Sequence, residues 1–434
     1  MDYQALYAQK KGTVDDALRL IRSNDVVCMA GECNEATVFA HNLHKIAPHV
    51  ENVRIHKGRT GNFDFVQGGG MAGRLETEGF FYGPGWGEGN RNGNVSLTVT
   101  DLPDYGPFVC QYTHPNVFVA AVTPMDERGN FQIGLCLMWE SDMLKDVMSQ
   151  PDHRIILEVN PQLVRVKGGL EINIEDVTCL YEEDYALKQM PAMEPTEVED
   201  TIGGLVAELV HDGDTIQLGI GSLPDAVAHH LMDKRDLGLH TEMFTSSMGE
   251  MIRRGVITGE RKNFLKGLHI GAFAGGDRAL YETMRDTTTL RIVPGSYAVN
   301  PMTVMQNDNM VSINTILEMD LTGQVCSESI GPRQFSGSGG GFCFAYGALH
   351  SKGGRGILAF ASQSKKGLPK IKPTLTPGAA VTIPRNYVDY IVTEYGVARM
   401  RGRNVRERCE QLIAIAHPDD RAELREQARK LFYI

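Results

Sequence analysis

One glutamate in the middle of the chain stands among residues that could support chemistry. Glu242 lies between the pair His240-Thr241 and the apolar pair Met243-Phe244. Glycine-rich segments, whose backbone N–H groups are bare, precede and follow it in the sequence. A carboxylate that faces such N–H groups is a candidate reacting acid. The alternative is an ordinary carboxylate at a helix end or on the surface.

The first glycine-rich segment follows the short apolar run 215–218, which we predict to be a strand. Its residues are Gly219, Ile220, Gly221, Ser222 and Leu223. Ser222 is a good helix N-cap and Pro224 suits a first helical turn, so the free N–H groups here suit an oxyanion or a phosphate. The dinucleotide-binding fingerprint Gly-x-Gly-x-x-Gly is excluded because its third glycine is absent from this segment. The alternative is a tight turn whose small residues only allow packing.

The second glycine-rich segment covers residues 336–341 and follows Glu242 in the sequence. Its four glycines are Gly337, Gly339, Gly340 and Gly341. The segment lacks the Gly-x-Ser-x-Gly pattern of a nucleophile elbow, which argues against a serine hydrolase of the α/β type. Because glycine lets the backbone approach a ligand closely, we predict that this segment lines a site.

A repeated pattern indicates two similar halves. Residues 14–43 predict a helix, a strand, a glycine turn and a second helix, and the same order returns at 205–231. Gly31 matches Gly219 and His41 matches His229 at a constant difference of 188. A chain of 434 residues exceeds the size of one hydrophobic core. We therefore predict an α/β protein with two similar domains, each with a central, mostly parallel sheet flanked by helices.

The boundary between the halves is expected within 182–201, where acidic residues and prolines replace the periodic pattern. This gives an N-terminal domain over 1–190 and a C-terminal domain over 191–434, which carries Glu242 and both glycine segments. Apolar runs predict further strands at 53–55, 95–100, 117–122, 154–159, 290–293, 310–316, 356–361 and 388–393. Helical patterns cover 405–415 and 418–431, and the glycine-dense stretch 58–94 predicts long loops that line a site.

The composition excludes some classes of protein. The chain is 42% hydrophobic and carries a formal net charge of −11. Non-specific binding to nucleic acid needs clustered Lys and Arg, so we predict no nucleic-acid partner. The N-terminus lacks a signal-peptide core, and no apolar run approaches the roughly 18 residues of a membrane span. We expect a cytoplasmic protein with no membrane partner.

The cysteines and histidines give no sign of a metal site. The eight cysteines are scattered without a Cys-x-x-Cys pair, which favours reduced core residues. The nearest approach to metal-ligand spacing is His41-x-x-His44, near Cys28 and Cys33 in the sequence. No second cluster of ligands lies close to it. We therefore predict no metal.

Several motifs occur in order along the chain, at residues 124–129, 158–160, 220–225, 239–243, 310–314, 320–325, 392–408 and 415–419. Together they resemble the acetyl-CoA hydrolase/transferase family, and above all its 4-hydroxybutyrate CoA-transferases. The resemblance covers nearly the whole chain. It implies two domains of CoA-transferase type and self-association into a homodimer or a higher homo-oligomer.

The resemblance also implies a reaction. Glu242 would be the nucleophile that attacks an acyl-CoA, giving a mixed anhydride and then a glutamyl-CoA thioester, which a second acid resolves in a ping-pong mechanism. Gly337, Gly339, Gly340 and Gly341 would stabilise oxyanions and hold substrate, and the segment from Gly219 to Leu223 would bind CoA. Coenzyme A would be a substrate, with no permanently bound cofactor. The expected partners are acyl-CoA and small carboxylic acids.

One departure from the family bears on the acid. Where many relatives continue the second glycine segment with Gln-x-Asp, this chain has Gly341-Phe342-Cys343. The lost carboxylate, with Arg59, Arg74 and Arg91 in or beside the long loops, leads to the hypothesis of a short dicarboxylate or hydroxyacid, with succinate, itaconate and 4-hydroxybutyrate as candidates. Butyrate is the other candidate acid, with acetyl-CoA or succinyl-CoA as donor.

A cluster of basic residues offers a second hypothesis, contact with the CoA phosphates. Its members are Lys365, Lys366, Arg399, Arg401, Arg403, Arg406 and Arg408. The alternative is a solvated helix face.

Two other activities compete with CoA transfer. An acyl-CoA hydrolase on the same scaffold would differ only in letting water reach the anhydride or the thioester. A CoA-binding protein without catalysis would need Glu242 to be idle. An assay of CoA release with and without an acceptor acid separates the transferase from the hydrolase.

Overall fold

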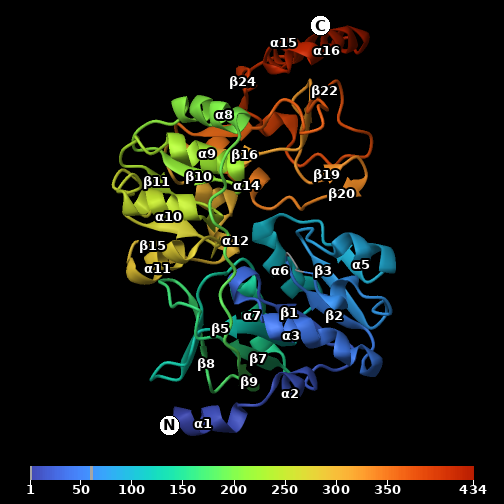
Figure 1. Ribbon diagram of the computed structural model, residues 1–434, viewed down its shortest axis with the longest axis vertical. Coiled ribbons are helices and arrows are strands. Elements are labelled where there is room, and N and C mark those ends of the chain that lie inside the picture. The colour runs from blue at the N-terminus through green and yellow to red at the C-terminus, as the bar shows by residue number, and fades with distance from the viewer. Residues whose placement is uncertain (1, 59–61) are drawn as a thin grey trace. The chain divides into compact units, whose positions relative to one another are not determined.

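The computed structural model describes residues 2–58 and 62–434. The chain forms two compact units, each with its own sheet (Figure 1). Unit 1 comprises Met1–Gln189 and Ile270–Ala298, and unit 2 comprises Met190–His269 and Val299–Ile434. The chain first leaves unit 1 after Gln189, next to the boundary expected between 190 and 191. It then returns to unit 1 for the 29 residues Ile270–Ala298.

Unit 1 is built on a seven-stranded parallel sheet with the order β4-β3-β2-β1-β5-β7-β9. Its strands are β1 (Val26–Met29), β2 (Val53–His56), β3 (Leu75–Gly79), β4 (Val95–Leu97), β5 (Val117–Val122), β7 (Arg154–Val159) and β9 (Cys179–Glu182). The strands predicted at 53–55, 117–122 and 154–159 are confirmed, and of the strand predicted at 95–100 only residues 95–97 form one. The α/β fold class with parallel sheets is confirmed as well.

The prediction of long loops over 58–94 was wrong in part. This stretch contains α4 (Asp64–Gln67), strand β3 and α5 (Trp86–Asn92). Strand β3 escaped prediction because two of its five residues are glutamates, Glu76 and Glu78, which alternate with buried residues. Its buried positions hold Leu75, Thr77 and Gly79, so the strand offers one strongly apolar residue and the alternating signal is weak.

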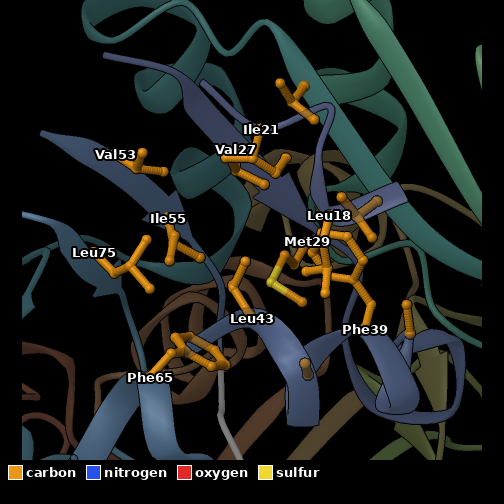
Figure 2. Close-up of a cluster of buried hydrophobic side chains, with 14 of the residues drawn as sticks. Leu18, Ile21, Val27, Met29, Phe39, Leu43, Val53, Ile55, Phe65 and Leu75 are labelled. Carbon is orange, nitrogen blue, oxygen red and sulfur yellow. The ribbon is translucent and has the colours of Figure 1, made fainter. Parts of the chain in front are cut away.

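Helices cover both faces of the unit 1 sheet, and one apolar face packs against α3 (Thr37–Asn42) (Figure 2). The other helices of this unit are α1 (Tyr3–Lys10), α2 (Val14–Leu18), α6 (Leu102–Tyr112), α7 (Glu140–Ser149), α11 (Arg278–Asp286) and α12 (Gly295–Ala298). Val27 and Met29 of β1 point to the same side as Ile55 of β2, toward Phe39 and Leu43. This follows from the two-residue period of a strand.

Unit 2 is built on a six-stranded sheet with the order β11-β10-β16-β21-β23-β24. Its strands are β10 (Thr215–Leu218), β11 (Gly238–Leu239), β16 (Met310–Thr315), β21 (Arg355–Ala359), β23 (Tyr390–Thr393) and β24 (Gly396–Arg399), of which only β24 is antiparallel. Short strands β12 (Met243–Phe244), β17 (Glu318–Asp320), β18 (Val325–Cys326), β19 (Ser329–Ile330), β20 (Arg333–Gln334) and β22 (Ile371–Lys372) lie outside it.

The helices of unit 2 are α8 (Glu197–Glu208), α9 (Ser222–His230), α10 (Ser246–Arg253), α13 (Pro301–Val304), α14 (Gly341–His350), α15 (Val405–Ile415) and α16 (Arg421–Lys430). The helix predicted over 405–415 is confirmed, and a capping box of Asn404 and Glu407 fixes its start. Among the described residues, no helix is long and apolar enough to cross a membrane.

The internal repeat is confirmed by strand order. The order β2-β1-β5-β7-β9 in unit 1 corresponds to β11-β10-β16-β21-β23 in unit 2. A buried ion pair recurs with it: Arg154 opens β7 and binds Asp25, while Arg355 opens β21 and binds Asp214. Each aspartate directly precedes the first strand of its repeat, so the two units tie the same pair of strands together.

The aspartates also correct the alignment of the repeat. The difference between 25 and 214 is 189, one more than the 188 inferred from matched residues. Backbone bonds agree, because Ala30 N–H donates to Val119 as Gly219 N–H donates to Ile313. Near the strands, Gly219 therefore corresponds to Ala30.

Candidate active site

The carboxyl edge of the unit 2 sheet gathers the predicted site residues. Glu242 follows β11 at a bend before β12, and the first glycine segment follows the neighbouring parallel strand β10. Helix α14 leads into β21, which runs parallel to both, so the α14 N-terminus lies at the same edge. Parallel α/β sheets bind ligands at this edge.

Glu242 is half-buried, and its carboxylate accepts a hydrogen bond from the Gly340 N–H group. A Cβ atom added to Gly340 would run into this carboxylate and into Val299. Only glycine therefore allows the backbone of the second segment to approach Glu242 this closely. The structure brings together two residues that stand far apart in the sequence.

Burial gives this carboxyl group an unusual pKa. Desolvation raises the pKa of Glu242 to about 7, and the hydrogen bond from Gly340 lowers it only in part. The ordinary value is 4.5. A large fraction of Glu242 is therefore ionised at neutral pH while remaining poorly solvated, a state that suits a carboxylate nucleophile.

The pKa of Glu242 predicts how a neutral variant affects stability. An acid whose pKa is higher in the folded state stabilises the fold most below pH 4.5, and this contribution is lost as the pH rises through about 7. We expect Glu242→Gln to gain in melting temperature over the wild type as the pH increases from 5 to 8. Thermal unfolding across this range is the measurement, and a pH-independent difference would contradict the raised pKa.

The second glycine segment ends at a helix N-terminus. Gly340 is the N-cap of α14 and Gly341 its first residue, so the first helical turn begins where the prediction placed the end of a loop. Gly339 has a φ of +56°, which side chains rarely adopt, and Gly337 is buried. The N–H groups at this terminus are available to developing negative charge.

The first glycine segment also meets a helix N-terminus, one residue earlier than predicted. Gly221 is the N-cap of α9 with a φ of +111°, and Ser222 is the first helical residue. The prediction of Ser222 as the N-cap was therefore wrong: its hydroxyl donates to Glu199 of α8 instead. Ile220 is 45% exposed, whereas Leu223 is buried and packs in the core.

The side chains of Asp225 and Ser247 form a contact at the carboxyl edge of the sheet that the sequence did not predict. Asp225 accepts hydrogen bonds from Ser247, in the first turn of α10, and from the Met193 N–H group. The carboxylate thus ties α9, which starts at the first glycine segment, to α10, which follows Glu242 by four residues. Pairing with Ser247 is a tertiary contact that only the fold reveals.

A reciprocal amide pair lies beside them. Gln217 at the end of β10 and Asn314 at the end of β16 exchange two hydrogen bonds of 3.1 Å. The pair links the strands directly before the first glycine segment. Both residues stand in stretches that the sequence had singled out, but their partnership could not be foreseen.

The arginines considered for a substrate charge have other partners. Arg74 donates to the carbonyl oxygens of Ala47 and Val50, and Arg91 forms an ion pair with Glu88. Arg59 lies outside the described residues. The observed contacts give the dicarboxylate hypothesis no support from Arg74 or Arg91.

Two arginines of the basic cluster have partners within unit 2. Arg403 pairs with Glu407, and Arg408 donates to the carbonyl oxygens of Thr322 and Arg385. Lys365 interacts electrostatically with Glu199, the residue that also binds Ser222. Lys365 therefore acts through its charge on a partner of the first glycine segment. In the described part of the chain, no three His, Cys, Asp or Glu residues form a group that could hold a metal ion.

Comparisons with known proteins agree with this architecture. A family model described as the acetyl-CoA hydrolase/transferase C-terminal domain matches residues 276–428. The chain is 35% identical to a succinyl-CoA:cyclohexane-1-carboxylate CoA transferase of Geobacter metallireducens, over 99% of this chain and 97% of that protein. It is 34% identical to a 4-hydroxybutyrate coenzyme A transferase of Clostridium kluyveri over the full length of both.

A solved structure extends the agreement to the fold. The crystal structure of RipA from Yersinia pestis matches with a TM-score of 0.93 and 31% sequence identity, covering 100% of both chains. The resemblance inferred from the motifs is thereby confirmed. The chain belongs to the acetyl-CoA hydrolase/transferase family, and it is a CoA-transferase acting between acyl-CoA and carboxylates.

Proposed function

We propose that Glu242 is the nucleophile of a ping-pong CoA transfer between two carboxylic acids. The observation that carries this proposal is the half-buried carboxylate that touches the Gly340 N–H group at the carboxyl edge of the unit 2 sheet. Burial makes the carboxylate poorly solvated, and the backbone donor orients it. A covalent route keeps the energy of the thioester, so the transfer needs neither ATP nor a metal.

The first half-reaction proceeds in two steps. A Glu242 carboxylate oxygen attacks the thioester carbonyl of the acyl-CoA, the C–S bond breaks, and a mixed anhydride and a CoA thiolate result. The thiolate then attacks the glutamyl carbonyl of the anhydride. This step releases the first acid as a carboxylate and leaves a glutamyl-CoA thioester.

The second half-reaction repeats these steps in reverse with the acceptor acid. The acceptor carboxylate attacks the glutamyl thioester and expels the CoA thiolate, which then attacks the acceptor carbonyl of the new anhydride. The new acyl-CoA leaves, and Glu242 returns as a free carboxylate. No proton has to be stored on the enzyme, because each nucleophile is an anion and each leaving group departs as one.

The glycine segments supply the remaining roles. Each tetrahedral intermediate bears an oxyanion, and the N–H groups of Gly337, Gly339, Gly340 and Gly341 are proposed to stabilise it. The segment from Gly219 to Leu223 is proposed to bind CoA, with Ile220 and Gly221 presenting backbone N–H groups at the start of α9. The Gly219 N–H group donates to Ile313, so Gly219 would contribute the close approach of its backbone. Lys365, whose charge acts on the Glu199 carboxylate that accepts from Ser222, is proposed to meet a phosphate of CoA.

The proposed substrates are short acids: 4-hydroxybutyrate, butyrate, succinate or itaconate, with acetyl-CoA or succinyl-CoA as donor. The two relatives compared above are described as transferases for 4-hydroxybutyrate and for cyclohexane-1-carboxylate with succinyl-CoA, which supports a small acid. Self-association into a homodimer or a higher homo-oligomer stays a prediction.

The proposal predicts that CoA transfer depends on an acceptor acid. With acetyl-CoA or succinyl-CoA as donor, each candidate acid should give a new acyl-CoA in equal amount to the donor consumed. Release of free CoA without an acceptor should be at least about a hundredfold slower, because water must replace a bound carboxylate. Mass spectrometry of the acyl-CoA pool measures both rates. Free CoA released at the same rate with and without acceptor would instead establish a hydrolase.

A further inference from the structure

Helix α14, whose N-terminus lies at the candidate site in unit 2, has a counterpart in unit 1, which is helix α7. Helices α7 and α14 both have ten residues, and each ends five residues before the arginine of the recurring ion pair. Aligned in this way, Trp139 corresponds to Gly340, because both are N-caps. Glu140 corresponds to Gly341, because both begin the helix.

The end of strand β11, which leads to Glu242, has a counterpart in unit 1 at the end of strand β2. The registers of β1 with β2 and of β10 with β11 align His56 with His240, and two residues further they align Gly58 with Glu242. Both histidines are buried and hydrogen-bonded. The unit without Glu242 thus keeps a buried, hydrogen-bonded histidine at the same position.

Each unit therefore has a carboxylate at this edge, but in unit 2 it comes from the strand end and in unit 1 from the helix. In unit 2 the strand end supplies Glu242 and the helix supplies glycines. In unit 1 the strand end supplies Gly58, and the helix supplies Trp139 and Glu140. A Cβ atom on Gly58 would run into the Trp139 ring, as one on Gly340 would run into the Glu242 carboxylate. The same two positions touch in both units.

Glu140 fills its position completely. Its side chain is fully buried and accepts hydrogen bonds from the Gly31 N–H group at 2.9 Å, from the Trp139 N–H group at 3.0 Å and from the Cys136 thiol at 3.2 Å. The donors come from the turn after β1 and from the N-terminus of α7. The corresponding elements in unit 2 are the first glycine segment and the N-terminus of α14.

Unit 2 leaves the corresponding position without a side chain. Gly341 is the counterpart of Glu140, and a Cβ atom added there would meet no atom within 4 Å. The counterpart of Gly31 is Ile220, one residue past the aligned pair Ala30 and Gly219. The backbone of Ile220 is thus the unit 2 equivalent of the donor that holds Glu140.

We propose that both units contain the same carboxylate-holding position, which unit 1 fills with its own Glu140 and unit 2 leaves open at Gly341 for a carboxyl group of the ligand. We call the position in unit 1, which Glu140 fills, the closed copy, and the position in unit 2 at Gly341 the open copy. In unit 2 the ligand oxygen would accept from the Ile220 N–H group, the counterpart of Gly31, and from the Gly341 N–H group, the counterpart of the Glu140 N–H group that bonds its own carboxylate. The counterpart of the Trp139 donor is the Gly340 N–H group, which donates to Glu242. The statement about unit 2 rests on the proposed function, whereas the statement about unit 1 does not.

The proposal for unit 1 is tested by removing the Glu140 side chain and measuring whether a small carboxylate binds in its place. Glu140→Gly removes a side chain equivalent to propionate and leaves its donors behind, so the variant should bind small carboxylates in unit 1. At pH 8, we expect the full-length variant to unfold at a lower temperature than the wild type. Sodium propionate should then raise its melting temperature by at least about 2 °C more than sodium chloride of equal ionic strength. Butyrate, which is longer than the removed side chain, should give less.

The matched control is Glu140→Gln, which keeps the position filled and should gain no more from propionate than the wild type does. If Glu140→Gly does not fold, Glu140→Ala with acetate replaces it, since that pair restores the same atoms. Equal effects of carboxylate and chloride on both opened variants would overturn the proposal. CoA transfer by the wild type would remain intact in that case, so the proposed function would survive.

The open copy is tested by closing it. Gly341→Glu introduces into unit 2 the carboxylate that unit 1 has. The best acceptor acid from the transfer assay should raise the melting temperature of the wild type and fail to raise that of Gly341→Glu. An undiminished response of Gly341→Glu to the acid would show that the ligand carboxyl group binds elsewhere.

Discussion

Glu242→Gln is expected to lose CoA transfer by at least about 10³-fold, because an amide oxygen cannot form the mixed anhydride. The variant keeps the shape of the side chain and one oxygen that can accept from the Gly340 N–H group. CoA binding should therefore persist within a few-fold of the wild type. Steady-state transfer and calorimetric titration with CoA measure the two quantities separately.

The variant Glu242→Asp shows whether catalysis needs only a negative charge at this position or a correctly placed nucleophile. It keeps the anion but withdraws it by one methylene from Gly340, and misplacement of about 1 Å costs roughly a hundredfold. We expect activity between those of the wild type and Glu242→Gln. If Glu242→Gln retained more than about a tenth of the wild-type rate, Glu242 would not be the nucleophile.

Gly340→Ala is expected to be the most damaging change in the glycine segments, with a loss of at least about a hundredfold in kcat. A Cβ atom at this position would collide with the Glu242 carboxylate and with Val299. Either the nucleophile moves or the helix N-terminus does, and in both cases the N–H donor is lost. The measurement is kcat together with thermal unfolding, to separate inactivity from misfolding.

Gly356→Ala is the matched control for this substitution. Gly356 lies in β21 of the same sheet, and a Cβ atom there would make only ordinary contacts at 3.7 Å or more. It should transfer CoA within about twofold of the wild type. Comparable activity in Gly340→Ala and Gly356→Ala would mean that close approach to Glu242 is not needed.

The sequence could predict those strands that are buried on both faces. The apolar runs of β5 and β7 have no exposed positions, and their lengths fit strands between turns. Strand β3 was missed because its outward residues are charged and its surroundings rich in glycine. The return of Ile270–Ala298 to unit 1 could not be predicted, since it depends on tertiary packing.

The candidate site was predictable in its residues but not in its geometry. The composition of residues 336–341 pointed to backbone donors, and the surroundings of Glu242 pointed to a reacting carboxylate. That Gly340 touches Glu242 follows only from the parallel order of β11, β10, β16 and β21, which brings distant segments to one edge. The error at Ser222 arose because Gly221, with its positive φ, takes the N-cap position.

The most direct test of the account is to trap the enzyme-bound thioester. The wild type is incubated with acyl-CoA in the absence of an acceptor acid, treated with borohydride, digested and analysed by peptide mass mapping. The account predicts that Glu242 is converted to the corresponding alcohol, that the conversion requires acyl-CoA, and that an acceptor acid added before borohydride reduces it. An unmodified Glu242 peptide from enzyme that transfers CoA under the same conditions, or a modification at another carboxylate, would contradict the covalent mechanism.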